Sequence, residues 1–175
     1  MKFELQDMSD AQITSVKDMI EDNSKQLQQI VNDIIEPYCK DLDEYVLFIK
    51  KCLHDGETPP TTQELEDFCM NLSTYIYFAG GMQEQLGIRD DIAKAVYKER
   101  YNASRNSIQK GTVADKDSMA ELNSQEQALV SVAYTRAYKI MKSKVENAQE
   151  LLGSCKKVLS HRITEEELTN FNGGR

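Results

Sequence analysis

Proline, tryptophan and histidine are scarce in this sequence, which has three Pro, no Trp and two His among 175 residues. Proline occurs only at Pro37, Pro59 and Pro60, and the alternating β-branched residues that are typical of strands are nearly absent. Apolar residues instead recur at intervals of three and four along most of the chain. The pattern predicts an all-α fold, namely a helical bundle with a long C-terminal helix and coiled-coil-like packing.

Long hydrophobic runs are also missing. No apolar run approaches the roughly 18 residues that a membrane-spanning helix needs, and the N-terminal residues lack the basic and then apolar pattern of a signal peptide. We therefore expect no membrane association and a cytoplasmic location, which is the host-cell cytoplasm if a phage encodes the chain.

The motifs that carry common enzyme chemistry are absent as well. His54 and His161 lie near no signature of a Ser or Cys nucleophile, and the glycines match neither the dinucleotide-binding fingerprint nor the P-loop. The four cysteines are far apart and lack the paired spacing of metal ligands. We expect reduced cysteines, no metal, no cofactor and no enzymatic activity.

Turn and capping signals divide the chain into three predicted parts. These are residues 1–58, an acidic N-terminal helical hairpin; residues 59–162, a helical core with basic faces and a long C-terminal helix; and residues 163–175, a short capping helix and tail. Pro37 ends the first helix or kinks it, because proline lacks the amide hydrogen that a helix interior uses. Thr61 and Glu64 have the spacing of a capping box, and Gly111 suits a left-handed helix end. The predicted helices run from about Asp10 to Glu36, from about Tyr38 to His54, from Thr61 onward, from Asp90 or Asp91 to about Gln109, from about Asp115 to His161, and from Ile163 onward with a second capping box at Thr164 and Glu167.

Charge is distributed unevenly along the chain. Residues 1–91 hold 7 Lys and Arg against 19 Asp and Glu, a net charge of −12, whereas residues 92–162 hold 13 against 7, a net charge of +6. Like charges gathered on one segment set the sign of the local field, so the second segment is the one that favours an anionic partner.

Two groups of cations lie within this basic segment. Lys94, Lys98, Tyr101 and Arg105 are spaced by four, three and four residues, so they share a helical stripe about 60° wide. The second group consists of Arg136, Lys139 and Lys142. These residues are predicted to project from the side of the long helix opposite its apolar residues, and Tyr134 and Tyr138 border that side. Cations attract phosphates without sequence preference and exposed tyrosines can stack on unpaired bases, so the pattern favours single-stranded DNA, although a merely solvated face has the same composition.

The stretch from Lys94 to Arg162 resembles the phage UvsY-type recombination mediators. It consists of a basic aromatic helix (KAVYKERYNASR), a break (KGTVADKD) and a long helix (AYTRAYKIMKSKVENAQELLGSCKKVLSHR). The resemblance implies a homo-oligomeric, non-enzymatic phage or prophage protein that binds single-stranded DNA during recombination or replication. It implies a basic DNA-binding helix made of Lys94, Lys98, Arg100, Tyr101 and Arg105. The sequence departs from that layout by its acidic front segment of about 90 residues, which permits a basic protein partner instead.

Two other classes of function remain open. The acidic segment can act as a DNA mimic that inhibits a host nuclease or a CRISPR effector, with phosphate-like carboxylates at Asp41, Asp43, Glu44, Glu64, Glu66 and Asp67. A structural helical protein of a virion or another assembly needs no site at all. In each case the apolar seams can close within one chain or between chains.

Overall fold

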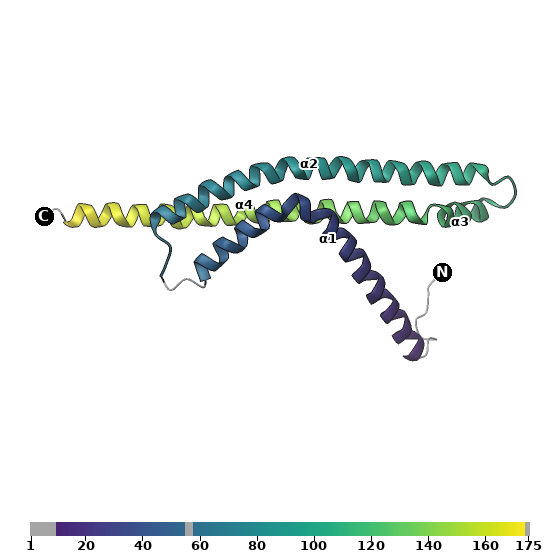
Figure 1. Ribbon diagram of the computed structural model, residues 1–175, viewed down its shortest axis with the longest axis horizontal. Helices are drawn as coiled ribbons and strands as arrows, with labels where there is room; N and C mark the ends of the chain where they lie inside the picture. The colour runs from purple at the N-terminus through teal and green to yellow at the C-terminus, as the bar shows by residue number, and fades with distance from the viewer. Residues whose placement is uncertain (1–9, 55–57, 174–175) are drawn as a thin grey trace.

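The computed structural model describes residues 10–54 and 58–173. Within these ranges the chain forms four helices and no strand: α1 (Asp10–His54), α2 (Thr62–Ser107), α3 (Val113–Asn123) and α4 (Gln125–Gly173). Helices α2 and α4 lie side by side along an extended rod, and the part of α1 from Leu27 onward packs against them (Figure 1). The prediction of an all-α helical bundle is confirmed. None of the helices in the described ranges is both long and apolar enough to span a membrane.

Helix α1 is continuous across Pro37, where the sequence predicts either an end or a kink. Figure 1 shows the kink: the N-terminal half of α1 turns away from the rod. The cause is the pyrrolidine ring, which removes one backbone hydrogen bond and clashes with the preceding turn. Residues 10–54 are therefore one bent helix and not the two helices of a hairpin. The sequence also predicts an exposed turn over residues 55–60, of which residues 55–57 lie outside the described residues.

Helix α2 joins two predicted helices into one. It begins at the predicted capping box, in which the Thr61 hydroxyl accepts from the Glu64 amide while the Glu64 carboxylate accepts from the Thr61 amide at 2.7 Å. The second helix start predicted at Asp90 or Asp91 is wrong, because Asp90 lies inside α2 with its side chain buried. Gly80 and Gly81 do not interrupt the helix, and an added Cβ at either position would meet nothing within 4 Å.

The predicted long last helix is divided in two. Gly111 has a φ of 120°, as predicted, and Thr112 and Asp115 form a capping box that starts α3. The fully buried Ser124 ends α3, and its hydroxyl donates to the Ala120 carbonyl at 2.7 Å. Helix α4 then continues to Gly173, so the separate helix predicted from residue 163 is absent. The Thr164 hydroxyl donates to a backbone carbonyl one turn earlier instead of capping a new helix.

The core is narrow and contains mostly one row of side chains from each helix. It consists of Val31, Ile35, Cys39, Leu42, Ile49, Leu65, Phe68, Leu72, Ala79, Leu86, Ala133, Ala137, Met141, Val145 and Ala148. Alanines in α4 allow the helices to approach closely. This core stops short of the loop-proximal end of α2 and of the first residues of α1, which leaves both with exposed apolar side chains.

Candidate nucleic-acid interface

A buried carboxylate joins α2 to α4 at the centre of the candidate site. Asp90, with 4% of its surface exposed, accepts a hydrogen bond from the Thr135 hydroxyl at 2.6 Å and from the Lys94 ammonium at 2.7 Å. Burial alone would raise the pKa of Asp90, but the hydrogen bonds from Lys94 and Thr135 outweigh it, so the pKa is lowered. The ionised carboxylate therefore fixes the register of the two helices at neutral pH.

Four lysines share one side of the paired helices. Lys94 and Lys98 follow Asp90 at steps of four on α2, while Lys139 and Lys142 follow Thr135 at four and seven residues on α4. Such steps keep side chains on one helix face. Since the hydrogen bond from Thr135 to Asp90 brings the two faces together, the lysines form one surface, which we call the basic face: Lys94, Lys98, Lys139 and Lys142.

The basic face lies away from α1. Helix α1 contacts Arg89, whose guanidinium carbon is 5.5 Å from the Tyr38 ring centroid, and Lys144, whose ammonium donates to Asp43 at 2.7 Å. Arg89 and Lys94 are five residues apart, as are Lys139 and Lys144, and five residues turn a helix by about 140° from the starting direction. Helix α1 therefore leaves the basic face uncovered.

Two of the four lysines have carboxylate partners. Lys94 pairs with Asp90, and Lys142 lies 3.9 Å from Glu146, both at a spacing of four residues. Both lysine side chains remain about half exposed. Lys98 and Lys139 are exposed, and among the described residues neither has an ion-pair partner. These two carry the charge of the basic face that is free to meet a phosphate.

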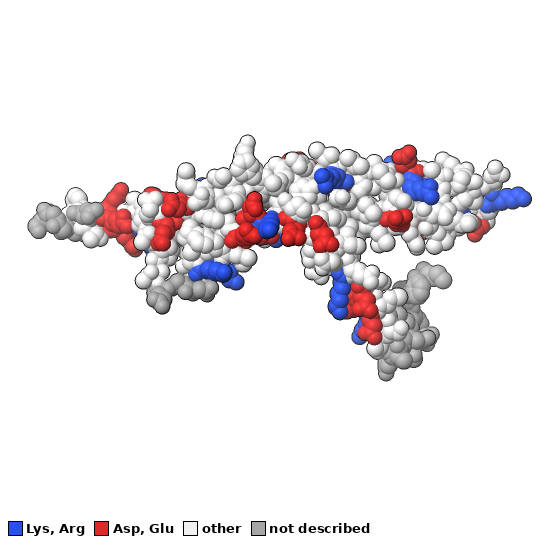
Figure 2. Space-filling model, in the orientation of Figure 1, with Lys and Arg blue, Asp and Glu red and all other residues white. Residues whose placement is uncertain are grey.

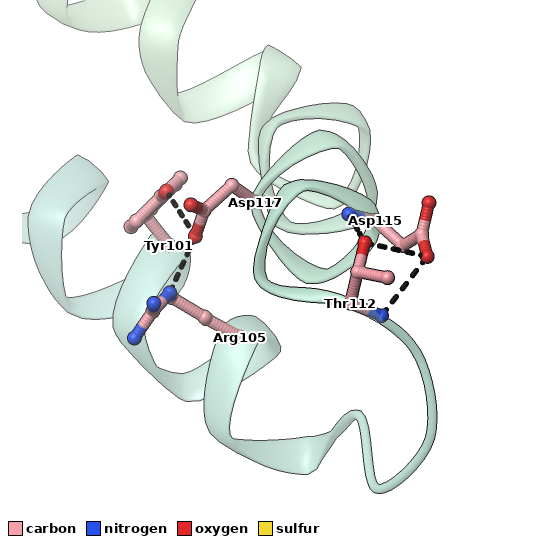
Figure 3. Close-up of polar contacts among 5 residues, drawn as sticks. All are labelled: Tyr101, Arg105, Thr112, Asp115 and Asp117. Atoms are coloured by element: carbon pink, nitrogen blue, oxygen red, sulfur yellow. Dashed lines mark hydrogen bonds and ion pairs between the residues drawn. The ribbon is translucent and has the colours of Figure 1, made fainter.

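Tyr101 and Arg105 contact α3 instead of facing solvent freely. The Asp117 carboxylate accepts from the Tyr101 hydroxyl at 3.2 Å and from the Arg105 guanidinium at 2.5 Å (Figure 3). The hydrogen bond from Arg105 lowers the pKa of Asp117 and also raises that of Arg105. Tyr101 and Arg105 therefore hold α3 against α2, and this pairing reduces the charge that they can offer to DNA.

The remaining predicted residues, Arg100 and Arg136, are exposed and are not part of the four-lysine basic face. Arg100 follows Lys98 by two residues, a step that turns its side chain to another side of α2. Arg136 follows Thr135 by one residue and precedes Lys139 by three, so it lies at the edge of the basic face. Tyr134 and Tyr138, which border the cations in sequence, are half-buried and pack against the core. They are not free for stacking on bases.

A shallow depression of about 390 Å³ adjoins the basic face. Its walls bring together three residues of the predicted stripe, Lys94, Lys98 and Tyr101, with Tyr97 of α2 and Glu121 of α3. Tyr97 was not among the predicted site residues, although its step of three from Lys94 places it beside that lysine. It is only partly buried, and its ring lies 6.4 Å from that of Tyr101.

The acidic surface that a DNA mimic requires is partly engaged elsewhere. Asp43 pairs with Lys144, Glu64 belongs to the capping box, and Asp67 accepts from Gln63 at 3.4 Å. Figure 2 shows acidic and basic residues intermixed on the side of the molecule that it presents, with wide uncharged areas between them. In the described part of the chain no group of three or more His, Cys, Asp or Glu residues is arranged to hold a metal ion.

Comparisons of the chain with protein-family models, with curated proteins and with solved structures found no match.

Proposed function

We propose that this chain is a non-enzymatic, self-assembling phage or prophage protein that binds single-stranded DNA through the basic face during recombination or replication. The observation that carries the proposal is that four lysines, from two helices far apart in the sequence, share the side that α1 leaves open and extend in both directions from the contact between Asp90 and Thr135. A row of cations beside a partly exposed tyrosine suits a flexible phosphate backbone with unpaired bases.

The extended surface supports the self-assembly in this proposal. The chain exposes 13350 Å² at a mass of 20.0 kDa, whereas a compact monomer of that mass exposes about 8,700 Å². Many large apolar side chains contribute to the difference, including Ile92 and Val96 on α2 and Leu122 and Leu129 on α3 and α4. Groups of exposed large apolar side chains are typical of surfaces that another chain covers.

The test is a titration of labelled oligothymidylate, followed by fluorescence anisotropy at several salt concentrations. For Lys98→Glu combined with Lys139→Glu, loss of two phosphate contacts reduces the slope of log K against log salt by about 1.4 and weakens binding about 25-fold near 0.1 M salt. The matched control is Lys50→Glu combined with Lys51→Glu, which makes the same charge change at exposed positions of α1.

The control variant is expected to bind nearly as tightly as the unaltered chain. Equal losses in both double variants would show that only net charge matters and would contradict a localised site. Absence of binding by the unaltered chain at low salt would refute the DNA-binding proposal outright.

A further inference from the structure

An apolar groove runs between α2 and α4 on the side of the hairpin that α1 occupies. It has a volume of about 440 Å³, and its walls are formed by Arg89, Ile92, Ala93, Val96, Glu126, Gln127, Val130 and Tyr134. Ile92, Val96 and Val130 are each about half exposed, at 56%, 47% and 46%. The groove adjoins α1, because Arg89 at its edge stacks on Tyr38, the residue after the proline kink.

The groove continues the track along which α1 packs. On α4, α1 contacts Lys144, whose ammonium donates to Asp43, and Val130 and Glu126 lie about four and five turns earlier on the same face. A helix that extended the path of α1 would therefore lie in the groove. Helix α1 is kinked at Pro37, and its first residues point away from α2 and α4 instead of lying along them (Figure 1).

One residue of the groove wall, Gln127, has a polar atom that lacks a partner. Its Oε1 is buried and accepts no hydrogen bond from the described part of the chain. A buried acceptor without a donor costs stability, so an occupant is favoured if the Gln127 side chain turns towards it and accepts from an amide or ammonium group that it brings.

The chain itself carries a segment with the matching properties. Residues 10–26 of α1, which we call the arm, precede Leu27, the first residue of α1 that packs against the core. The arm is helical and exposes Met19 and Ile20 at 58% and 60%. It also carries donors in Asn23 and Gln26.

The charges of the arm and of the α2 wall of the groove are complementary. The arm holds four acidic and two basic residues. Arg89 lines the α2 wall, whereas the α4 wall includes the acidic Glu126. Arg100, one turn beyond Val96 on the α2 side, has no ion-pair partner within the described ranges. An acidic amphipathic helix can therefore bury its apolar stripe in the groove while its carboxylates approach these two guanidinium groups.

We propose that two copies of this chain form a dimer by exchanging arms, so that the arm of each copy lies in the α2–α4 groove of the other. This inference rests on the self-assembly in the proposed function and adds to it the segment and the groove that make the contact. A two-fold arrangement of this kind uses each pair of surfaces twice, which doubles the area buried by one helix in one groove.

The experiment measures the mass of the full chain by light scattering over a range of concentrations, without nucleic acid. The arm variant is Ile20→Glu, and the groove variants are Val130→Glu and, independently, Val96→Glu. Each places two charges in the dimer at apolar contacts, and each is expected to raise the dimer dissociation constant at least about 100-fold. Met70→Glu is the matched control, because Met70 is 72% exposed on α2 and does not line the groove. Helix content from circular dichroism verifies that the variants fold.

Mixing distinguishes exchange from any other dimer. A pair formed by one Ile20→Glu chain and one Val130→Glu chain retains one unaltered arm in one unaltered groove, so the mixture is expected to recover dimer that neither variant forms alone. A dimer that persists in the arm and groove variants, or a mixture that stays monomeric, overturns the arm exchange while leaving self-assembly intact. A monomeric unaltered chain overturns both, and DNA binding by such a monomer would still be measured separately.

Discussion

Asp90 links the stability of the paired helices to the charge of the basic face, and neutralising it should move these two properties in opposite directions. Its carboxylate accepts hydrogen bonds from Lys94 and Thr135 and is almost fully buried. Asp90→Asn keeps the size of the side chain and an oxygen that can accept from Thr135. The substitution removes the negative charge that holds Lys94.

The two expected effects follow from these contacts. Stability should fall by about 1 to 2 kcal/mol, because a charge-assisted hydrogen bond from Thr135 becomes a neutral one and a half-exposed ion pair contributes less than about 1 kcal/mol. Release of Lys94 adds one available phosphate contact to the basic face. One such contact strengthens binding to single-stranded DNA about fivefold near 0.1 M salt.

Urea unfolding and anisotropy titration on the same preparations measure both effects. Glu66→Gln is the control, because it makes the same charge change at an exposed position near the other end of α2. Tighter DNA binding with lower stability, seen in Asp90→Asn and not in the control, is the expected result. Unchanged or weaker DNA binding in Asp90→Asn would refute the assignment of Lys94 to the DNA contact.

The pH dependence of the stability loss gives an independent check on Asp90. Since the folded-state pKa of Asp90 is lowered, its ionised form stabilises the native state at pH values above the unfolded-state pKa of about 4. That stability is lost as the pH falls through the lower folded-state pKa. The difference in unfolding free energy between the unaltered chain and Asp90→Asn should therefore be constant near neutral pH and shrink below about pH 4. A difference that persists undiminished in acid would contradict the hydrogen-bond account.

The other predictions concern three separate contacts. Gly80→Ala should stabilise α2 by about 0.5 to 1 kcal/mol in urea unfolding, because alanine favours helix and its Cβ meets no neighbour. Gly87→Ala should stabilise the protein less or destabilise it, because its Cβ would lie 3.2 Å from the Tyr138 ring. An equal gain in stability at both sites would contradict the packing. Thr112→Ala removes the cap of α3 and should cost about 1 kcal/mol in the same assay, and no loss would contradict the cap. Burial and the hydrogen bond to the Asp43 carboxylate raise the pKa of Cys39 to about 11. Mass spectrometry should therefore show that the Cys39 thiol is alkylated about 100-fold more slowly at mildly alkaline pH than an ordinary thiol. A normal rate would contradict the buried environment.

Local signals in the sequence predict local structure well. The capping box at Thr61 and the left-handed Gly111 both occur where the spacing and residue types place them. Such features depend on residues within one turn of each other, so the sequence contains all the information that they need. The all-α class follows in the same way from the three-and-four spacing of apolar residues.

Helix boundaries that depend on tertiary contacts could not be predicted in this way. Aspartate is a common helix cap, and the sequence therefore suggests a cap at Asp90. In the structure the Asp90 carboxylate instead accepts a hydrogen bond from the hydroxyl of Thr135, 45 residues further along the chain, and is buried inside α2. Ser124 likewise ends α3 at a buried position, in a stretch whose apolar spacing suggests one unbroken helix. In both places tertiary packing outweighs the local pattern.

The candidate site was predictable in part for the same reason. Spacing predicted that Lys94, Lys98 and Tyr101 share one helical stripe, and in the structure all three line one surface depression, since they lie on one helix. The ion pair of Lys94 with Asp90 could also have been found, because the spacing of four residues is visible in the sequence. The partner of Tyr101 and Arg105 could not, because Asp117 reaches them only after α3 folds back along α2 (Figure 3).

Several lysines and arginines of the predicted site pair with nearby carboxylates, so the proposed DNA binding depends more strongly on the assembly of several copies of the chain. Lys98 and Lys139 are the lysines of one basic face without a carboxylate partner in the described chain. Counterion release at two phosphate contacts raises the binding constant for single-stranded DNA only about 25-fold near 0.1 M salt. One copy alone would therefore bind weakly. Arm exchange uses the α1 side of the hairpin and leaves the basic face of each copy open, so a dimer presents two such faces to one strand. Two linked weak sites then act with a high effective concentration, which raises the overall affinity without any new contact to the DNA.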